Sequence, residues 1–261
     1  MQDQAEAPQT AADEYCLAVV HGPLGDPGKA LREAVAHGAG CLVGIPVQML
    51  AIAEHPEAKL LQGAIKSVLL TTDYVPKAIA GRIRKALGCE IFEHYGMTET
   101  GLGGGVDCQA HGGYHLRGAD LYYEVVDPQS GAPLQPGQQG ELVVTTLTRQ
   151  AMPLIRYRTG DGGRLLPEYG CPCGGVTPRL ERVPGRLANR LHLGEGERLP
   201  MWCLDEALFA VPGVLDYRAS LNNDESRSRL ELMIHANAVA PPELSLKIEQ
   251  AVNNESVRIS V

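Results

Sequence analysis

One short segment combines residue types that suit a ligand with a base and phosphates. An apolar predicted strand is followed by the run HYGMTET, from His94 to Thr100. Ligands of open α/β sheets bind beyond the carboxyl ends of strands. The Tyr95 ring can stack on a base, the Thr98 hydroxyl can donate to a phosphate oxygen, and the Glu99 carboxylate suits Mg²⁺, which prefers oxygen ligands. Taken alone, the segment is equally well explained as an ordinary turn.

Two later segments add a carboxylate and a guanidinium. The run IRYRTGD predicts a strand that ends at a Thr-Gly-Asp turn, where Asp161 can accept two hydrogen bonds from a ribose diol. The alternative is an Asp that only caps the turn. Gly185 and Arg186 stand at a predicted domain junction, where a hinge could bring the guanidinium to a nucleotide. Viewed alone, Arg186 is better explained as a surface residue of a linker.

Four residues in the same part of the chain suit a structural zinc ion. Cys108 lies seven residues before His115, and Cys171 and Cys173 form a C-P-C-G pair. Three thiols and one imidazole make a common tetrahedral zinc set, although the C-x-C spacing is shorter than usual. His111 is an alternative to His115, and four unlinked loop residues are the alternative to a site. The remaining cysteines flank apolar runs and are expected in the core: Cys16, Cys41, Cys89 and Cys203.

The elements around the first segment alternate between strand and helix. Apolar runs predict strands at Tyr15–Val20, Cys41–Ile45, Val68–Thr71 and Cys89–Phe92, and helical patterns fall at Pro27–His37, Val47–Glu54 and Pro76–Leu87. This order predicts a largely parallel sheet with helical crossovers, an α/β fold class. Residues 16–99 form this part, after a disordered lead-in at 1–15.

The pattern changes after residue 99. Residues 100–184 are rich in Gly and Pro and predict short antiparallel strands at Leu121–Val126, Glu141–Leu147 and Leu154–Tyr157. Residues 185–261 predict a small α+β domain, with helices at Trp202–Ala210 and Pro242–Val252 and strands at Val214–Leu221, Leu230–His235 and Val257–Val261. The zinc set would tie together two loops of the β-rich part.

Composition excludes several classes of partner. The 261 residues carry a net charge of -8 without a basic run, which argues against nucleic acid and anionic membranes. The longest apolar stretch, Cys41–Ala53, is too short for a membrane span, and the polar N-terminus is no signal peptide. Seven cysteines, an odd number, do not predict a disulfide framework. We therefore expect a cytoplasmic protein that binds small molecules.

Taken together, the three segments resemble the adenylate-forming superfamily. YGMTE matches its Y-G-x-[ST]-E motif, YRTGD its Y-x-T-G-D motif, and GR the start of its hinge motif. The run TTLTRQAMPLIRYRTGD followed by C-x-C-G is similar to the phenylacetate–CoA ligase branch, and the Cys and His positions resemble those of some of its members. The resemblance covers residues 30–255 and implies an AMP-forming ligase that activates an aryl or acyl carboxylate and passes it to coenzyme A.

The resemblance also implies a role for each matched residue. Tyr95, with Gly96, would contact adenine, and Asp161 would hold the ribose. Thr98 would contact the α-phosphate of ATP, Glu99 would bind Mg²⁺, and Arg186 would contact the ribose or a phosphate. Members of this branch are often dimers, which makes a homodimer an expectation.

Three features depart from the family pattern. No Gly/Ser/Thr-rich phosphate loop precedes the motifs, and Gly101–Gly105 is better explained as a flexible loop on the substrate side. The family's C-terminal lysine has no match, since the last lysine, Lys247, stands in a predicted helix, and Arg186 is followed by Leu187 where the family has acidic residues. Two hypotheses follow: a ligase whose N-terminal region lies ahead of residue 1, or a degenerate relative that binds nucleotide without turnover.

Overall fold

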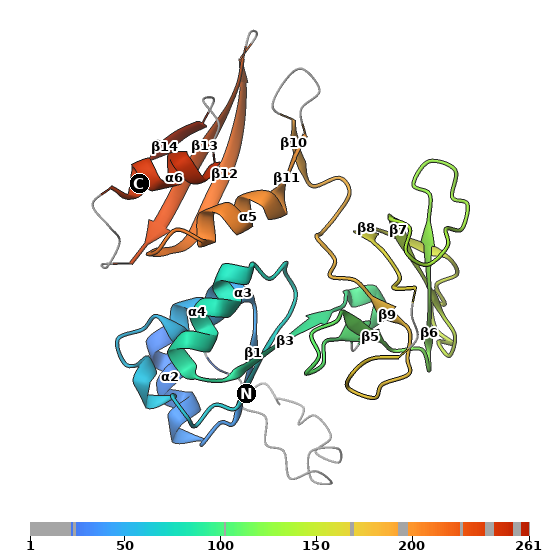
Figure 1. Ribbon diagram of the computed structural model, residues 1–261, viewed down its shortest axis with the longest axis horizontal. Coiled ribbons are helices and arrows are strands. Elements are labelled where there is room, and N and C mark those ends of the chain that lie inside the picture. Colours follow the sequence, from blue (N-terminus) through green and yellow to red (C-terminus); the bar gives the residue numbers. More distant parts are fainter. Residues whose placement is uncertain are drawn as a thin grey trace, which may run out of the picture.

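The chain forms three lobes (Figure 1). The computed structural model describes residue 22 and residues 25–101, 103–167, 170–192, 198–224, 227–237, 243–252 and 257–260. We name the lobes the α/β lobe (25–95), the β-rich lobe (96–184) and the C-terminal lobe (185–260). The predicted lead-in, the run Tyr15–Val20 and Cys16 lie outside the described residues. In the described part, no helix is long and apolar enough to cross a bilayer.

Three parallel strands and three helices build the α/β lobe. The strands are β1 (Cys41–Gly44), β2 (Ser67–Leu70) and β3 (Glu90–Tyr95), and the helices are α2 (Pro27–Ala36), α3 (Pro46–Ala53) and α4 (Lys77–Leu87), with a 3₁₀ turn, η1 (Ala58–Leu60). The boundaries have local causes. The Asp26 carboxylate accepts from the backbone N–H of Lys29 at 2.8 Å to start α2, and left-handed Gly88 ends α4. The predicted β-α alternation is confirmed.

The sheet continues from the α/β lobe into the β-rich lobe through β3. The first four residues of β3 pair in parallel with β2, and its last two pair antiparallel with β4 (Gly105–Val106). The order β1-β2-β3-β4-β5-β9 is completed by β5 (Tyr114–Leu116) and β9 (Arg179–Leu180). A 3₁₀ turn, η2 (Thr98–Thr100), follows β3 directly. One strand therefore links the helical crossovers to the loops that carry the polar motif.

A separate antiparallel sheet holds the second motif. It consists of β6 (Leu121–Val126), β7 (Gly140–Thr146) and β8 (Tyr157–Gly163). The predicted strand Leu154–Tyr157 is wrong. The strand begins where that prediction ends, and it includes the Thr-Gly-Asp residues that the pattern assigned to a turn. The apolar side chains misled the prediction, because Ile155 is 78% exposed and lies in a loop.

The C-terminal lobe is a three-stranded sheet with two helices. β12 (Val214–Asp224) and β13 (Arg227–Ala236) are antiparallel, and β14 (Val257–Ser260) joins β13 in parallel. The helices are α5 (Met201–Phe209) and α6 (Leu244–Val252), and a two-stranded ribbon, β10 (Arg190–His192) and β11 (Arg198–Pro200), leads into α5. The α+β prediction for this part is confirmed.

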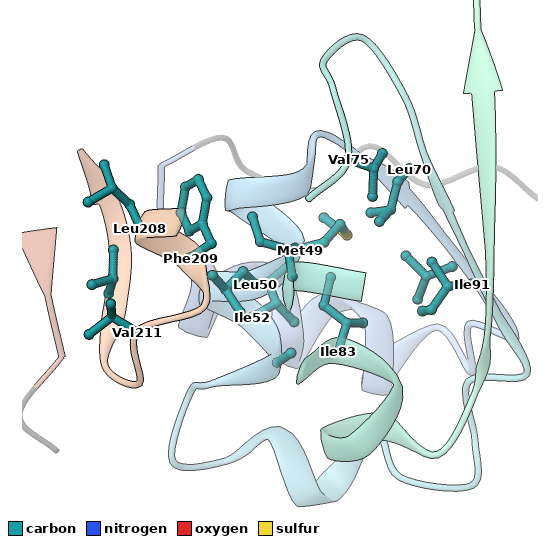
Figure 2. Packing of buried hydrophobic residues seen from close by; sticks show 14 of the residues in the cluster. Met49, Leu50, Ile52, Leu70, Val75, Ile83, Ile91, Leu208, Phe209 and Val211 are labelled. Atoms are coloured by element: carbon teal, nitrogen blue, oxygen red, sulfur yellow. The ribbon is translucent and has the colours of Figure 1, made fainter. Parts of the chain in front are cut away.

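The main apolar cluster joins two lobes. It surrounds α3, α4 and β2, and it continues into α5 and the sheet of the C-terminal lobe. Figure 2 shows Leu208, Phe209 and Val211 of the C-terminal lobe facing Met49 and Leu50 of α3. A second cluster fills the β-rich lobe around Tyr95, between the two sheets.

Polar contacts reinforce the junction between these lobes. The Glu206 carboxylate on α5 accepts from the Tyr74 hydroxyl at 2.6 Å and from the backbone N–H of Lys77 at 3.2 Å. It thereby caps α4, which has no side-chain cap of its own. The Arg82 guanidinium donates to the carbonyl of Val214 at 2.7 Å.

Burial corrects two expectations about cysteines and β1. Cys89 is buried as predicted, whereas Cys41 is exposed and Cys203 is half-buried. Cys41 lies on β1, whose side chains alternate between exposed and half-buried, and Val43 is 61% exposed. The apolar run was expected to form a buried strand. Within the described residues it instead forms β1, the edge strand of the sheet.

Candidate functional site

A break in the β7–β8 pairing places Asp161. Val143 pairs with Arg158 and Glu141 with Gly162, so three residues of β8 stand opposite Leu142 alone. The Thr159 hydroxyl stabilises this bulge, because it donates to the carbonyl of Leu142 at 2.9 Å and accepts from the N–H of Asp161 at 3.0 Å. Bulges of this kind redirect a side chain.

Buried polar groups hold the bulge from the other strand. Glu141 is 5% exposed, and its carboxylate accepts from the backbone N–H of Gly160 at 3.2 Å and pairs with the Arg158 guanidinium. Gly160 has a φ of +76°, a conformation that favours glycine. The glycine of the T-G-D motif is therefore required by the backbone.

Tyr95 meets Asp161 across the two sheets. Its hydroxyl donates to Asp161 Oδ2 at 2.8 Å, and its ring stacks on Tyr114 with 6.2 Å between ring centroids. Burial raises the pKa of Asp161 against the lowering effects of the Tyr95 hydrogen bond and Arg186. Burial and the neighbouring carboxylate raise the pKa of Tyr95, which stays a neutral donor. Sequence reasoning assigned Tyr95 to adenine and missed this contact.

Arg186 approaches the other oxygen of the same carboxylate. Asp161 and Arg186 form an isolated antiparallel bridge, and Arg186 Nε lies 3.9 Å from Asp161 Oδ1. The guanidinium is 66% exposed, whereas the Asp161 side chain is 14% exposed. Nearby, the Arg182 guanidinium binds Glu93 of β3 with contacts of 2.7 and 2.6 Å, which fixes the segment leading to Gly185.

The Thr98–Thr100 turn lies beside this carboxylate. The Glu99 carboxylate accepts from the Tyr157 hydroxyl at 3.1 Å, and Thr98 is exposed. The buried Thr100 hydroxyl donates to the carbonyl of Met97 at 2.9 Å and holds the turn. Gly96 packs closely, because a Cβ there would lie 2.8 Å from the His94 ring.

The three sequence segments thus come together at the end of β3. Hydrogen bonds or an ion pair link Tyr95 and Arg186 to Asp161, and Glu99 to Tyr157 on β8. Sequence reasoning missed the supporting residues Glu141 and Thr159. The sequence signals available were a charged residue, Glu141, at the start of an apolar strand, and an arginine in YRTGD, Arg158, with which it pairs in the structure.

The four predicted metal ligands also come together. The candidate ligand atoms of Cys108, His115, Cys171 and Cys173 lie within 4.8 Å of one another. Cys108 Sγ is 3.5 Å from Cys171 Sγ, and Cys173 Sγ is 3.4 Å from His115 Nε2. They come from the β4–β5 connection, β5 and the β8–β9 connection.

The two candidate histidines have different surroundings. His115 Nδ1 faces the Thr177 hydroxyl at 3.0 Å, which leaves Nε2 toward the thiols. His111 lies outside the cluster, with its Nδ1 2.5 Å from the Asp107 carboxylate. A backbone N–H and the neighbouring side chains lower the pKa of Cys171 to about 6, whereas burial raises that of Cys108 to about 11.

Comparison with known proteins assigns the class. The family model described as "AMP-binding enzyme" matches residues 16–149, about half of the chain. The chain therefore belongs to the AMP-binding enzymes, the adenylate-forming superfamily that the motifs resemble. Its sequence relatives include phenylacetate–coenzyme A ligases, which supports the similarity to that branch.

Those relatives are longer than this chain. A phenylacetate–coenzyme A ligase of Thermus thermophilus is 33% identical over 165 residues, which are 62% of this chain and 36% of the relative. The Escherichia coli K12 enzyme of the same name is 38% identical over 117 residues, 44% of this chain and 26% of the relative. The chain thus matches about a quarter to a third of the length of these relatives.

A solved structure supports the fold. A 2-hydroxyisobutyryl-CoA ligase, crystallised in the postadenylation state with an acyl-AMP ligand, superposes with a TM-score of 0.76. The two chains are 20% identical, and the match covers 92% of this chain and 54% of the other. The three lobes therefore have the arrangement found in an adenylate-forming CoA ligase.

Proposed function

We propose that this chain forms the nucleotide-binding part of an AMP-forming carboxylate–CoA ligase. The observation that carries the proposal is the position of Asp161, which binds Tyr95 of the first motif and faces Arg186 of the third. Three segments far apart in sequence supply one small polar site at the carboxyl end of β3. Ligands bind at such positions in α/β sheets.

The geometry supports distinct roles. Asp161, an acceptor with one oxygen held by Tyr95, would receive the ribose hydroxyls at the other. The exposed Thr98 would donate to the α-phosphate, and Arg186 would approach the ribose or a phosphate. The free oxygen of Glu99 fits a hard cation such as Mg²⁺, which would neutralise phosphate charge. Gly96 and Tyr95 would border the adenine.

The proposed reaction has two steps. A carboxylate attacks the α-phosphate of ATP and releases pyrophosphate, and a thiol of coenzyme A then displaces AMP from the acyl-adenylate. The residues described here would hold the nucleotide rather than form covalent bonds, so their contribution is positioning and charge stabilisation. The relatives named above favour an aryl or small acyl carboxylate as substrate.

Calorimetric titration of AMP and of a non-hydrolysable acyl-adenylate mimic tests the proposal. We expect binding by the protein, and a loss of about tenfold or more in affinity for Asp161→Ala, because hydrogen bonds to charged groups contribute about 1.5–3 kcal/mol. Asp216→Ala, an exposed aspartate of the C-terminal lobe, is the matched control. A folded protein that binds neither ligand would contradict the proposal.

A second candidate is a nucleotide-binding protein without turnover. It is favoured by the lack of a match to the family's C-terminal lysine. The last lysine, Lys247, has an exposed side chain on α6, and no residue of the described site lies on that helix. Release of pyrophosphate from ATP with a panel of aryl and acyl carboxylates separates the two candidates. Binding with no release for any acid would support the second.

The thiol and imidazole cluster fits a structural zinc ion. Its donor set, three cysteines and His115 with Nδ1 held by Thr177, is one that zinc prefers, and four protein ligands would leave no open catalytic position. Such a metal would tie the β4–β5 and β8–β9 connections together. Reduced thiols agree with the proposed cytoplasmic location.

Metal analysis of the purified protein tests this part. We expect one zinc per chain, with loss of the metal and a lower melting temperature in Cys171→Ser. Cys41→Ser, which changes an exposed cysteine outside the cluster, should keep the metal. A chain with no metal and an unchanged melting temperature in Cys171→Ser would contradict the zinc proposal.

Light scattering on the same sample measures the expected homodimer.

A further inference from the structure

Arg149 lies beside the turn that carries Thr98 and Glu99. It belongs to the β7–β8 connection, is half-buried, and its Nη2 lies 3.1 Å from the position that a Cβ on Gly101 would occupy. Gly101 has a φ of +76° and follows the turn directly. A side chain at Gly101 would crowd this guanidinium, so the glycine leaves room for Arg149 beside the turn.

The charge of Arg149 is not balanced within the described residues. Arg149 makes no hydrogen bond or ion pair there. Every other described arginine from residue 95 to residue 186 binds a carboxylate or a carbonyl: Arg117, Arg156, Arg158, Arg164, Arg179, Arg182 and Arg186. A half-buried guanidinium is stabilised by an anion, and its planar fork matches phosphate well.

A second arginine at this turn, Arg117, has the contacts expected of an arginine that stabilises the structure. Arg117 donates to the carbonyl of Thr100 at 2.9 Å and is paired with Asp120 at 2.7 Å. Its charge is thereby neutralised, and it fixes the turn. Arg149 has neither kind of contact, so holding the turn does not explain it.

We propose that Arg149 is a phosphate-binding residue of the nucleotide site. This inference rests on the proposed function, since it names a further residue of the same site. The guanidinium would contact a phosphate of the nucleotide at the turn that presents Thr98. That phosphate is either the α-phosphate, which AMP and ATP share, or the β- and γ-phosphates, which only ATP has.

Calorimetric titration of adenosine, AMP and Mg-ATP separates these contacts. For Arg149→Ala we expect unchanged affinity for adenosine and a loss of about tenfold for Mg-ATP, the size of one charge-assisted hydrogen bond. An equal loss for AMP assigns the contact to the α-phosphate, and an unchanged AMP affinity assigns it to the outer phosphates. Arg149→Lys should recover part of the affinity, because it keeps the charge without the fork.

Two further variants make the result specific. Arg84→Ala removes an exposed arginine of α4 and should leave all three affinities unchanged. Asp161→Ala should weaken adenosine as well as AMP, because it acts on the ribose. Equal affinities of Arg149→Ala and the unmodified protein for all three ligands would overturn this inference alone. Failure of the unmodified protein to bind any of them would overturn the proposed function, and this inference with it.

Discussion

The α/β lobe and the β7–β8 pair hold their structure in different ways. In the α/β lobe, strand pairs run in unbroken register, and side chains such as Leu50, Leu70 and Ile83 are fully buried. In β7–β8, the register breaks, and buried Glu141 and Thr159 take the positions where apolar residues would be expected.

The difference shows that stability and the placement of the site residues originate in different regions. Apolar burial stabilises in proportion to area and tolerates repacking, so the α/β lobe contributes mainly to stability. A buried polar group stabilises only while its hydrogen bonds are made. The β7–β8 pair therefore depends on precise geometry, and that geometry directs Asp161 toward Tyr95.

The largest expected effect is a loss of stability without a loss of binding. Ile83→Ala removes a side chain with no exposed surface, and we expect the free energy of unfolding to fall by about 2–5 kcal/mol. Leu60→Ala, at a position 54% exposed, should lower it by well under about 1 kcal/mol. Urea denaturation measures both. A tenfold loss of AMP affinity in folded Ile83→Ala would contradict the separation of the two regions.

Thr159→Val should affect both stability and binding. The change keeps the size of the side chain but removes the donor to the buried Leu142 carbonyl and the acceptor for the half-buried Asp161 N–H, which leaves both groups without this partner. We expect about 1–3 kcal/mol lower stability and weaker AMP binding, because the bulge would no longer fix Asp161. Urea denaturation and calorimetry on one sample give the two values. Unchanged binding at reduced stability would show that the bulge is purely structural.

Through Asp161, a lower pH should favour stability but weaken ligand binding. Since burial raises the pKa of Asp161, the native state binds this proton more readily than the unfolded state. Lowering the pH through this pKa therefore removes the cost of keeping a buried carboxylate charged, which makes the folded state relatively more stable. The same protonation removes charge from the carboxylate that accepts the ribose hydroxyls. We expect adenosine, which has no titrating phosphate, to bind more weakly as the pH falls through the raised pKa of Asp161. Asp161→Asn should remove that pH dependence.

The smallest expected effect comes from the surface of the α/β lobe. Arg32 and Glu57 form a 3.3 Å ion pair with side chains 59% and 47% exposed. We expect Arg32→Ala to lower stability by about 0.5 kcal/mol or less, because solvent screens exposed pairs. A loss above about 1 kcal/mol in urea denaturation would show that polar contacts matter in this lobe too.

Sequence reasoning worked best where one physical signal dominates. Helices α2 and α4 have clear apolar faces, and Pro27 and Gly88 mark their ends, so both were predicted within about one residue. The motif residues and the four metal-cluster residues could be named because their types and spacing are unusual. Their mutual distances could not be derived, since they depend on long-range strand pairing.

The errors also have physical causes. The strand at Leu154–Tyr157 was misplaced because a bulge lets the polar Thr-Gly-Asp residues stay within β8, while apolar Ile155 is exposed. The short strands β4 and β9 have two residues each, too few for any periodic pattern. The lack of an ion-pair partner for Arg149 among the described residues depends on which side chains lie near it in space, and a local sequence pattern cannot predict that.

The apolar cluster that α3 shares with α5 has a consequence for folding cooperativity. Because Phe209 and Leu50 belong to the same interior, neither the α/β lobe nor the C-terminal lobe can unfold without exposing apolar surface of the other. Differential scanning calorimetry should therefore record one transition for these two lobes. A chain cut after residue 200 would expose the matching surface of α3 to water and would be prone to self-association.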